Sequence, residues 1–349
     1  MTLNRRQFSA LAAATAASPW AGAQPQPQVN LAALYEAAKK EGELTWYVVP
    51  VPSEMGENLG RAFTARYPGI KVNVVRTTAQ VAFQRLNQDL KAGTPACDVF
   101  SSTDLAHYLD LKRRKLLTKF VPAAVSQIDP RLQNVDPDGY YHTSNVFMMG
   151  LIYNTQKVQA AAAPTSWADL TDPKWRGLAS VAHPGFSGAA GAWCIEMRKL
   201  YGNSWFQKLA DNKPQVGRST IDTVTTVTSG ERSISAGPTN LAAMMAARGN
   251  PLQNLAPKEG AVLIISPSAV MADSRHPNAA KLFMEWYLGS DDVERLVIAD
   301  YGVPLRAGAK PLPGVLGLGD GKKELTAKAS EMAQDLPHVV ELWKDAFGV

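Results

Sequence analysis

The feature that most constrains the fold is a regular alternation of short apolar strands with amphipathic helices near the start of the chain. Strand-like segments at 43–50, 71–76 and 98–101 are separated by helix-like segments at 54–67 and 79–92. Strands that alternate with helices favour parallel βαβ units in an α/β sheet. In such sheets, ligands bind outside the carboxyl ends of the strands. The residues directly after the three strands are therefore the first candidates for a binding site.

The three loops after these strands supply hydroxyl groups and one guanidinium, and none supplies an obvious base. The candidate ligand contacts are Ser53, Arg76, Thr77, Ser101, Ser102 and Thr103. Arg76 at the end of its strand is suited to a bidentate grip on phosphate, phosphonate or carboxylate. The alternative is a surface arginine whose aliphatic stem packs on the protein.

Two later apolar stretches, at 140–154 and 261–266, are β-like and break this alternation. We interpret them as strands that cross to a second lobe and back. The expected division is residues 24–143 plus 259–305 for lobe one and residues 144–258 plus 306–349 for lobe two. After the second crossing strand, Asn278 is predicted to cap a helix, and the remaining C-terminal stretch is predicted to be helical.

The amino-terminal 23 residues have the pattern of an export signal. Arg5 and Arg6, followed by Gln-Phe, resemble the twin-arginine motif, and an alanine-rich run leads to small residues that end at Ala23. An ordinary Sec signal is the alternative within the same class. No cysteine lies near the predicted cleavage site, so a lipid anchor is not expected. The sequence predicts a freely diffusing periplasmic protein.

Composition excludes some classes of function. The formal net charge is +5, of which the two signal arginines supply two charges, and the rest is too dispersed to indicate nucleic-acid binding. The basic run at 111–115 is expected to be the solvated face of a helix. Cys97 and Cys194 are expected to be small buried residues rather than a disulfide, because they fall in different lobes. Outside the signal no segment reaches the roughly 18–20 uninterrupted apolar residues of a membrane span.

The order of several segments resembles that of the solute-binding proteins of ABC importers. These segments are LTWYVVPVPSEMGENLGRAFTARYPGIKVNVVR, PACDVFSSTDL, GLIYNT, PTSWADLTDPKWRGLASVAHPGFSGAAGAW and GVPLR. The similarity covers about residues 31–307 and is greatest to the branch that includes ferric-iron-binding proteins and binders of phosphonates and sugar phosphates.

This resemblance implies the type II periplasmic-binding-protein fold, in which two α/β lobes joined by two crossing strands close on a ligand. It also implies delivery of the ligand to a permease in the inner membrane, with no catalysis and no cofactor. We expect a monomer.

The chain departs from the iron-binding pattern at the expected metal ligands. Iron binders of this branch carry adjacent tyrosines shortly after the strand that here spans 233–236, whereas this chain continues with apolar residues at 241–245. The five histidines show no paired metal spacing. Free ferric ion is therefore disfavoured as the ligand and no metal site is predicted. Thr239 and Asn240 become candidates for polar contacts instead.

Ser187 in HPGFSGAAGAW has two readings. The sequence Gly-Phe-Ser-Gly-Ala between a strand and a helix is close to a nucleophile elbow, which gives a secreted serine hydrolase as an alternative function. In the other reading, Ser187 and Gly188 lie at a helix start whose free N–H groups and dipole attract an anion. Ser219 and Thr220 form a similar helix start. The serines could also serve only as helix caps.

Together these features predict a binding protein for a small organic anion, with phosphonate or phosphate ester ahead of carboxylate. An importer for chelated ferric iron is the alternative within the same class. A sensor that presents its ligand to a membrane receptor also fits the sequence.

Overall fold

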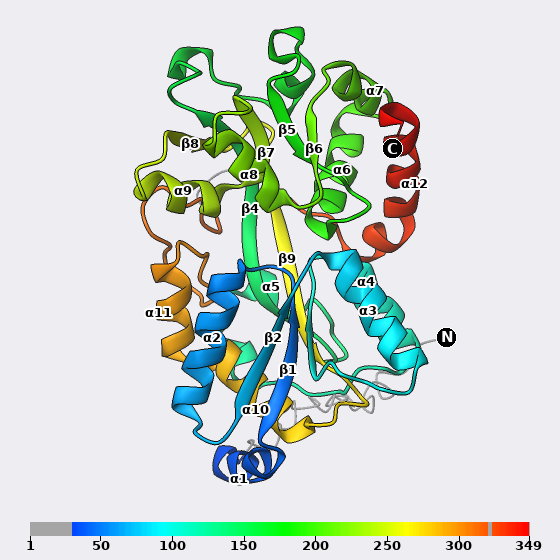
Figure 1. The fold of residues 1–349 in the computed structure, drawn as a ribbon, viewed down its shortest axis with the longest axis vertical. Helices are drawn as coiled ribbons and strands as arrows, with labels where there is room; N and C mark the ends of the chain where they lie inside the picture. The colour runs from blue at the N-terminus through cyan, green and yellow to red at the C-terminus, as the bar shows by residue number, and fades with distance from the viewer. Residues whose placement is uncertain (1–29, 320–322, 349) are drawn as a thin grey trace, which may run out of the picture.

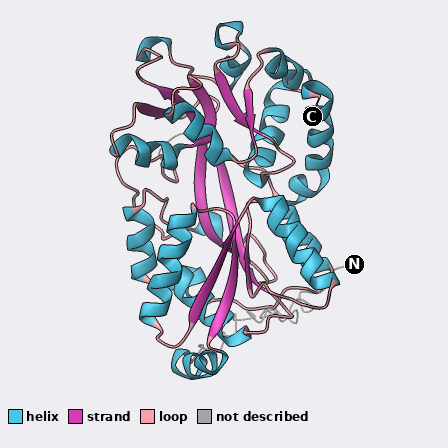
Figure 2. Ribbon diagram, in the orientation of Figure 1, coloured by secondary structure: helices cyan, strands magenta, loops and turns pink. Residues whose placement is uncertain are grey.

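Two long strands run through both halves of the molecule and make one continuous sheet. The computed structural model describes residues 30–319 and 323–348, so the expected export signal lies outside the described residues. Strands β4 (His142–Asn154) and β9 (Ala261–Val270) pair antiparallel and extend from the lower lobe into the upper one (Figures 1 and 2). The strand order is β2-β1-β3-β9-β4-β7-β5-β6, with β10 beside β9 and β8 beside β4. This is the two-lobed α/β architecture that the sequence predicted.

The lower lobe in Figure 1, lobe one, contains the predicted βαβ units. Strand β1 lies between β2 and β3 and is parallel to both, and Val48 at its end is opposite Arg76 and Ser101. The three strands therefore end at one edge. Its strands are β1 (Glu43–Val48), β2 (Lys71–Arg76) and β3 (Val99–Ser101); its helices are α1 (Leu31–Glu41), α2 (Ser53–Arg66), α3 (Ala79–Lys91), α4 (Leu105–Arg113), α5 (Pro130–Gln133), α10 (Pro277–Gly289) and α11 (Asp291–Ala299).

The upper lobe, lobe two, repeats the parallel pattern, because β5 pairs parallel with both β6 and β7. Here too the helices follow the carboxyl ends of the strands. The strands are β5 (Ala179–Ala182), β6 (Gln215–Gly217), β7 (Ile234–Pro238) and β8 (Leu252–Leu255); the helices are α6 (Gly188–Tyr201), α7 (Ser204–Asp211), α8 (Thr220–Thr228), α9 (Thr239–Ala247) and α12 (Ala329–Phe347). The short β10 (Glu324–Leu325) precedes α12.

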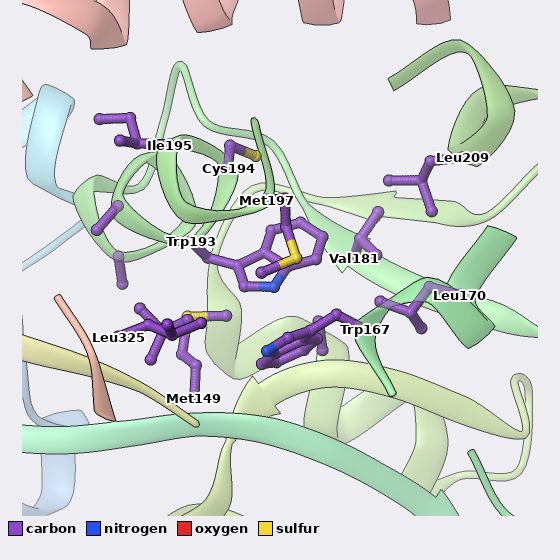
Figure 3. Close-up of a cluster of buried hydrophobic side chains, with 14 of the residues drawn as sticks. Met149, Trp167, Leu170, Val181, Trp193, Cys194, Ile195, Met197, Leu209 and Leu325 are labelled. Carbon is purple, nitrogen blue, oxygen red and sulfur yellow. The ribbon is translucent and has the colours of Figure 1, made fainter. Parts of the chain in front are cut away.

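Large aromatic side chains fill the cores. In lobe two, Trp193 of α6 meets Trp167 edge-on with ring centroids 5.8 Å apart, and Met149 of β4 is part of the same cluster (Figure 3). In lobe one, Trp46 packs on Phe283 with centroids 5.0 Å apart. These tryptophans contribute apolar burial rather than ligand contacts.

Both cysteines are buried and unbridged, as expected. Burial raises the pKa of both thiols well above the ordinary value. No helix in the described part of the chain is long and apolar enough to cross a membrane.

Two sequence predictions about the C-terminal third were wrong. Asn278 does not cap α10: the N-cap is His276, and Pro277 occupies the first turn. The carboxylate of Glu41 instead accepts hydrogen bonds from the backbone N–H groups of Asn278 and Ala279, at 3.0 and 2.8 Å. Residues 302–319 and 323–328 form turns, irregular segments and the short β10 rather than helix, which is consistent with their many Pro and Gly residues.

Asp98 joins the lower sheet to the chain that follows β9. This buried carboxylate accepts from the backbone N–H of Thr45 at 2.7 Å, from the Ser274 hydroxyl at 2.6 Å and from the His276 ring at 2.9 Å. One donor lies in β1 and the other two lie in the loop between β9 and α10, so one side chain ties β1 to that loop.

We expect Asp98→Ala to lower the free energy of unfolding by about 3 kcal/mol, because it leaves several buried donors without an acceptor. Asp292→Ala is the control, since Asp292 pairs with Arg295 on the half-exposed surface of α11 and should cost less than about 1 kcal/mol. Urea denaturation of both variants measures the difference. Equal losses would contradict the role given to Asp98.

Candidate functional site

A cavity lies where the carboxyl ends of the strands in the two lobes meet. It encloses about 840 Å³, its open mouth included. Lobe one contributes the loops after β1, β2 and β3 and the turn after α11; β4 contributes one wall; lobe two contributes the starts of α6, α8 and α9. In open α/β sheets, ligands bind outside the carboxyl ends of the strands, and here the strands of both lobes end at the same cavity.

Seven of the twelve predicted site residues line this cavity. They are Arg76, Thr77, Thr103, Ser187, Ser219, Thr220 and Asn240. They come from both lobes, so the structure brings together residues that are separated by up to about 160 positions in the chain.

The structure corrects the predictions for Ser101 and Ser102. The Ser101 hydroxyl accepts from the Trp46 indole N–H at 2.7 Å and lies 2.5 Å from the Ser268 hydroxyl, inside the sheet. The Ser102 hydroxyl is 3.0 Å from the His107 ring and accepts from the backbone N–H of Asp104. Both serines are buried and satisfied within the protein, so neither is available to a ligand.

Three further predicted contacts also lie outside the cavity lining. Ser53 is the exposed first residue of α2. Thr239 is buried and donates to the carbonyl of Met148 at 3.1 Å. Gly188 packs against the backbone of Asp104 in lobe one, where an added Cβ would lie 2.5 Å from the Asp104 nitrogen. Gly188 therefore permits a close contact between the lobes rather than a ligand contact.

Arg76 presents the cation that the sequence led us to expect. Its Nε donates to the carbonyl of Val51 at 3.2 Å, which fixes the guanidinium, and its two outer nitrogens have no hydrogen-bond partner among the described residues. Burial lowers the pKa of Arg76 and the nearby Asp222 raises it, but an arginine stays charged in either case. The free edge of the guanidinium is suited to two oxygens of one anion.

Helix starts surround the cavity, and they differ in how they are capped. Ser187 accepts from the N–H of Ala190 at 3.3 Å and Ser219 accepts from that of Ile221 at 3.2 Å, so these two serines do act as caps. No side chain caps α2, α3 or α9, although all three begin at the cavity. Because the first N–H groups of a helix have no partner within it, these three helices offer open donors and the positive end of a dipole.

The start of α10 shows how this protein treats such a helix end when no ligand is involved. There, the carboxylate of Glu41 occupies the position of an anion and accepts from two backbone N–H groups. No equivalent carboxylate of the described chain reaches the starts of α2, α3 and α9. An external anion would accept hydrogen bonds from the free N–H groups of these three helix starts, as Glu41 does at α10.

Three residues that line the same cavity each have a buried side-chain polar atom without a hydrogen-bond partner among the described residues. These atoms are Thr78 Oγ1, Thr103 Oγ1 and Asn240 Oδ1. An unpaired buried polar group costs about 1–3 kcal/mol, so such groups are uncommon unless a ligand or water pairs with them. Thr78 belongs to the loop that follows the second predicted strand, but it was not among the predicted ligand contacts.

Asn145 and Asp300 also line the cavity and could not have been found from the sequence. Asn145 faces it because the pairing of β4 with β9 shifts register between Thr143 and Asn145. Asp300 ends α11, and only the packing of α11 beside α2 brings it to the cleft.

The lining offers little for metal binding or nucleophilic catalysis. Among the described residues, no histidine or tyrosine lines the cavity, and no group of three His, Cys, Asp or Glu side chains is placed to hold a metal ion. Ser187, the candidate nucleophile, accepts a hydrogen bond from its own helix. The arrangement is suited to holding an oxyanion with neutral donors and one guanidinium.

Comparisons with known proteins agree with this architecture. A family model described as a bacterial extracellular solute-binding protein matches residues 95–313. An uncharacterised protein of Haemophilus influenzae is 23% identical over 267 residues, which cover 74% of this chain and 76% of that protein.

Two solved structures share the fold at low sequence identity. The periplasmic binding protein AfuA of Actinobacillus pleuropneumoniae, solved with fructose-6-phosphate, has a TM-score of 0.79 and 21% identity over 88% of this chain and 99% of its own. Iron-bound HitA of Pseudomonas aeruginosa has a TM-score of 0.74 and 19% identity over 87% of this chain and 99% of its own.

The close contact at Gly188 gives a test of the packing between α6 and lobe one. We expect Gly188→Ala to destabilise the protein by about 1–3 kcal/mol, because its Cβ meets rigid backbone at Asp104. Gly191→Ala on the same helix is the matched control, since its Cβ meets only the flexible end of Leu336. Chemical denaturation should rank Gly191→Ala as the more stable of the two, and the reverse order would contradict this account.

Proposed function

Because the chain belongs to the family of bacterial extracellular solute-binding proteins, we propose that it captures a small organic oxyanion between its lobes and delivers it to an ABC permease. The ligand class we favour is a phosphonate or phosphate ester, ahead of a carboxylate. The observation that carries the proposal is the cavity where three uncapped helix starts meet Arg76 and the unpaired hydroxyl groups of Thr78 and Thr103.

The number and direction of the donors favour a tetrahedral anion. The free N–H groups at the cavity belong to three separate helices, α2, α3 and α9. Two threonine hydroxyls and one guanidinium add further donors. A phosphonate or phosphate group has three oxygens that can accept from several directions at once, whereas a carboxylate has two in one plane. AfuA, a structural relative, holds a sugar phosphate, which is in line with this preference.

Iron is the less favoured ligand. HitA, another relative, binds iron, but the lining of the cavity in this chain supplies mainly hydroxyl, amide and N–H groups. Ferric ion prefers several anionic oxygen ligands, and Asp300 is the one carboxylate among the described lining residues. The proposal includes no catalytic step.

Both lobes contribute contacts to the ligand, so ligand binding favours the closed conformation of the two lobes. The permease would recognise that closed conformation. Arg76 and Thr103 belong to lobe one, whereas Ser187 and Asn240 belong to lobe two. We retain the division into residues 24–143 plus 259–305 and residues 144–258 plus 306–349 as part of this proposal, with β4 and β9 as the hinge. Export to the periplasm through the signal at 1–23 also belongs to it.

A thermal-shift panel on the ligand-free mature protein tests the function. We expect a phosphonate or phosphate ester to raise the melting temperature selectively, since a ligand at 100 times its Kd adds about 2.7 kcal/mol. The panel includes phosphate, sugar phosphates, phosphonates, carboxylates and ferric citrate. Stabilisation by iron alone, or by none of the anions, would overturn the proposal.

Arg76→Gln should weaken binding of the stabilising anion by about 10- to 100-fold, because it removes charge-assisted hydrogen bonds worth about 1.5–3 kcal/mol. Arg85→Gln is the matched control: Arg85 lies on α3, stacks over Tyr47 at 5.3 Å and does not line the cavity. Isothermal titration calorimetry gives both Kd values. An unchanged Kd for Arg76→Gln would show that Arg76 does not contact the anion.

A further inference from the structure

Among the described residues that line the binding cavity, one carboxylate accompanies the one guanidinium. Asp300 ends α11 and lines the cavity together with Val297 and Gly302 of the same turn. Its neighbour Tyr301 has a positive φ of 60° and packs against the apolar clusters of both lobes. The turn is therefore held where the lobes meet, on the side of the cleft where α11 and α9 lie (Figure 1).

The Asp300 carboxylate has no partner within the described protein. It makes no hydrogen bond through its side chain and no ion pair within 4.0 Å, either with Arg76 or with any other cation of the described chain. The charged groups that influence it are Arg248, at the end of α9, and Glu54, in the first turn of α2. The Asp300 carboxylate and the Arg76 guanidinium thus line one cavity without forming an ion pair with each other.

Burial raises the pKa of Asp300, Arg248 lowers it, and Glu54 raises it further. The cavity wall also contains the apolar side chains of Met55, Leu241 and Met244. A carboxylate in such surroundings is costly unless a donor pairs with it. A ligand whose only polar group is an oxyanion would leave the Asp300 carboxylate without a donor. Repulsion between that carboxylate and the oxyanion would weaken binding further.

We propose that the ligand carries, besides its oxyanion, a hydrogen-bond donor group, either hydroxyl or ammonium, which pairs with the Asp300 carboxylate. This inference rests on the proposed function, because it assigns the second end of the same ligand. Arg76 and the helix starts bind the phosphonate or phosphate, and Asp300 selects the organic part. Simple alkyl phosphonates and inorganic phosphate are then poor ligands.

The test compares matched probes with and without the donor. Ethylphosphonate and 2-aminoethylphosphonate differ by one ammonium group, and n-hexyl phosphate and fructose 6-phosphate differ mainly by hydroxyl groups. In the wild-type protein we expect the donor-bearing member of at least one pair to bind tenfold or more tightly by calorimetry. The pair that shows the preference distinguishes ammonium from hydroxyl.

Asp300→Asn keeps the side-chain shape and removes the charge. It should reduce affinity for the preferred donor-bearing probe by at least tenfold and leave its matched partner unchanged or bound more tightly. Glu54→Gln is the control, because Glu54 lies near Asp300 but is exposed and outside the cavity lining. Its probe preference should stay that of the wild type.

Other outcomes overturn the inference in distinguishable ways. An equal loss for both members of a pair would mean that Asp300 supports closure through Arg248 rather than contacting the ligand. If the simple anions bind and the wild type shows no donor preference, Asp300 has no selective role and the proposed function stands. If none of the four probes binds, the role given to Asp300 fails, and the thermal-shift panel decides separately whether the proposed function stands. The comparison of probes in the wild type is decisive even if Asp300→Asn does not fold.

Discussion

The antiparallel pairing of β4 with β9 is the constraint on which the rest of the structure depends. Strand β9 lies between β3 and β4 in the sheet, and β4 continues beyond it to pair with β7 and β8. Because the same two strands belong to both lobes, the carboxyl ends of β1–β3 face those of β5–β7 across one gap. Helices that follow these strands must then begin at that gap, which is why helix starts from both lobes converge on one cavity.

This geometry separates what the fold provides from what individual side chains provide. The fold brings free N–H groups to the cavity at α2, α3 and α9, and it would do so with many different sequences. Side chains decide whether those donors remain open. Ser187 and Ser219 close two helix starts by capping them, as Glu41 does at α10, whereas Thr78 leaves the start of α3 open and its own hydroxyl unpaired. In the proposed function, selective capping of the helix starts therefore decides where an anion can bind.

Sequence reasoning predicted the order of strands and helices well, because the alternation of apolar and polar residues has a different period in each. It located Arg76 and Thr103 because Arg76 ends one of the parallel strands and Thr103 follows another. It ended the third strand correctly at Ser101 but assigned that side chain to the ligand, whereas the Ser101 hydroxyl pairs with Trp46 and Ser268 on one face of the sheet. Asn145 depends on a register shift within β4, and Asp300 on the packing of distant helices, so neither has a local signal.

The charges of Arg76 and Asp300 bear on how proteins with one fold select chemically different ligands. A sugar phosphate and iron are held by relatives with the same architecture, so the helix starts cannot by themselves decide between them. Among the described lining residues, one guanidinium and one carboxylate share the cavity without forming an ion pair. These two opposite charges oppose each other's effect on a bound ion of either sign. Selectivity must then come from short-range hydrogen bonds and ion pairs. These favour a ligand with one group that pairs with Arg76 and another that pairs with Asp300.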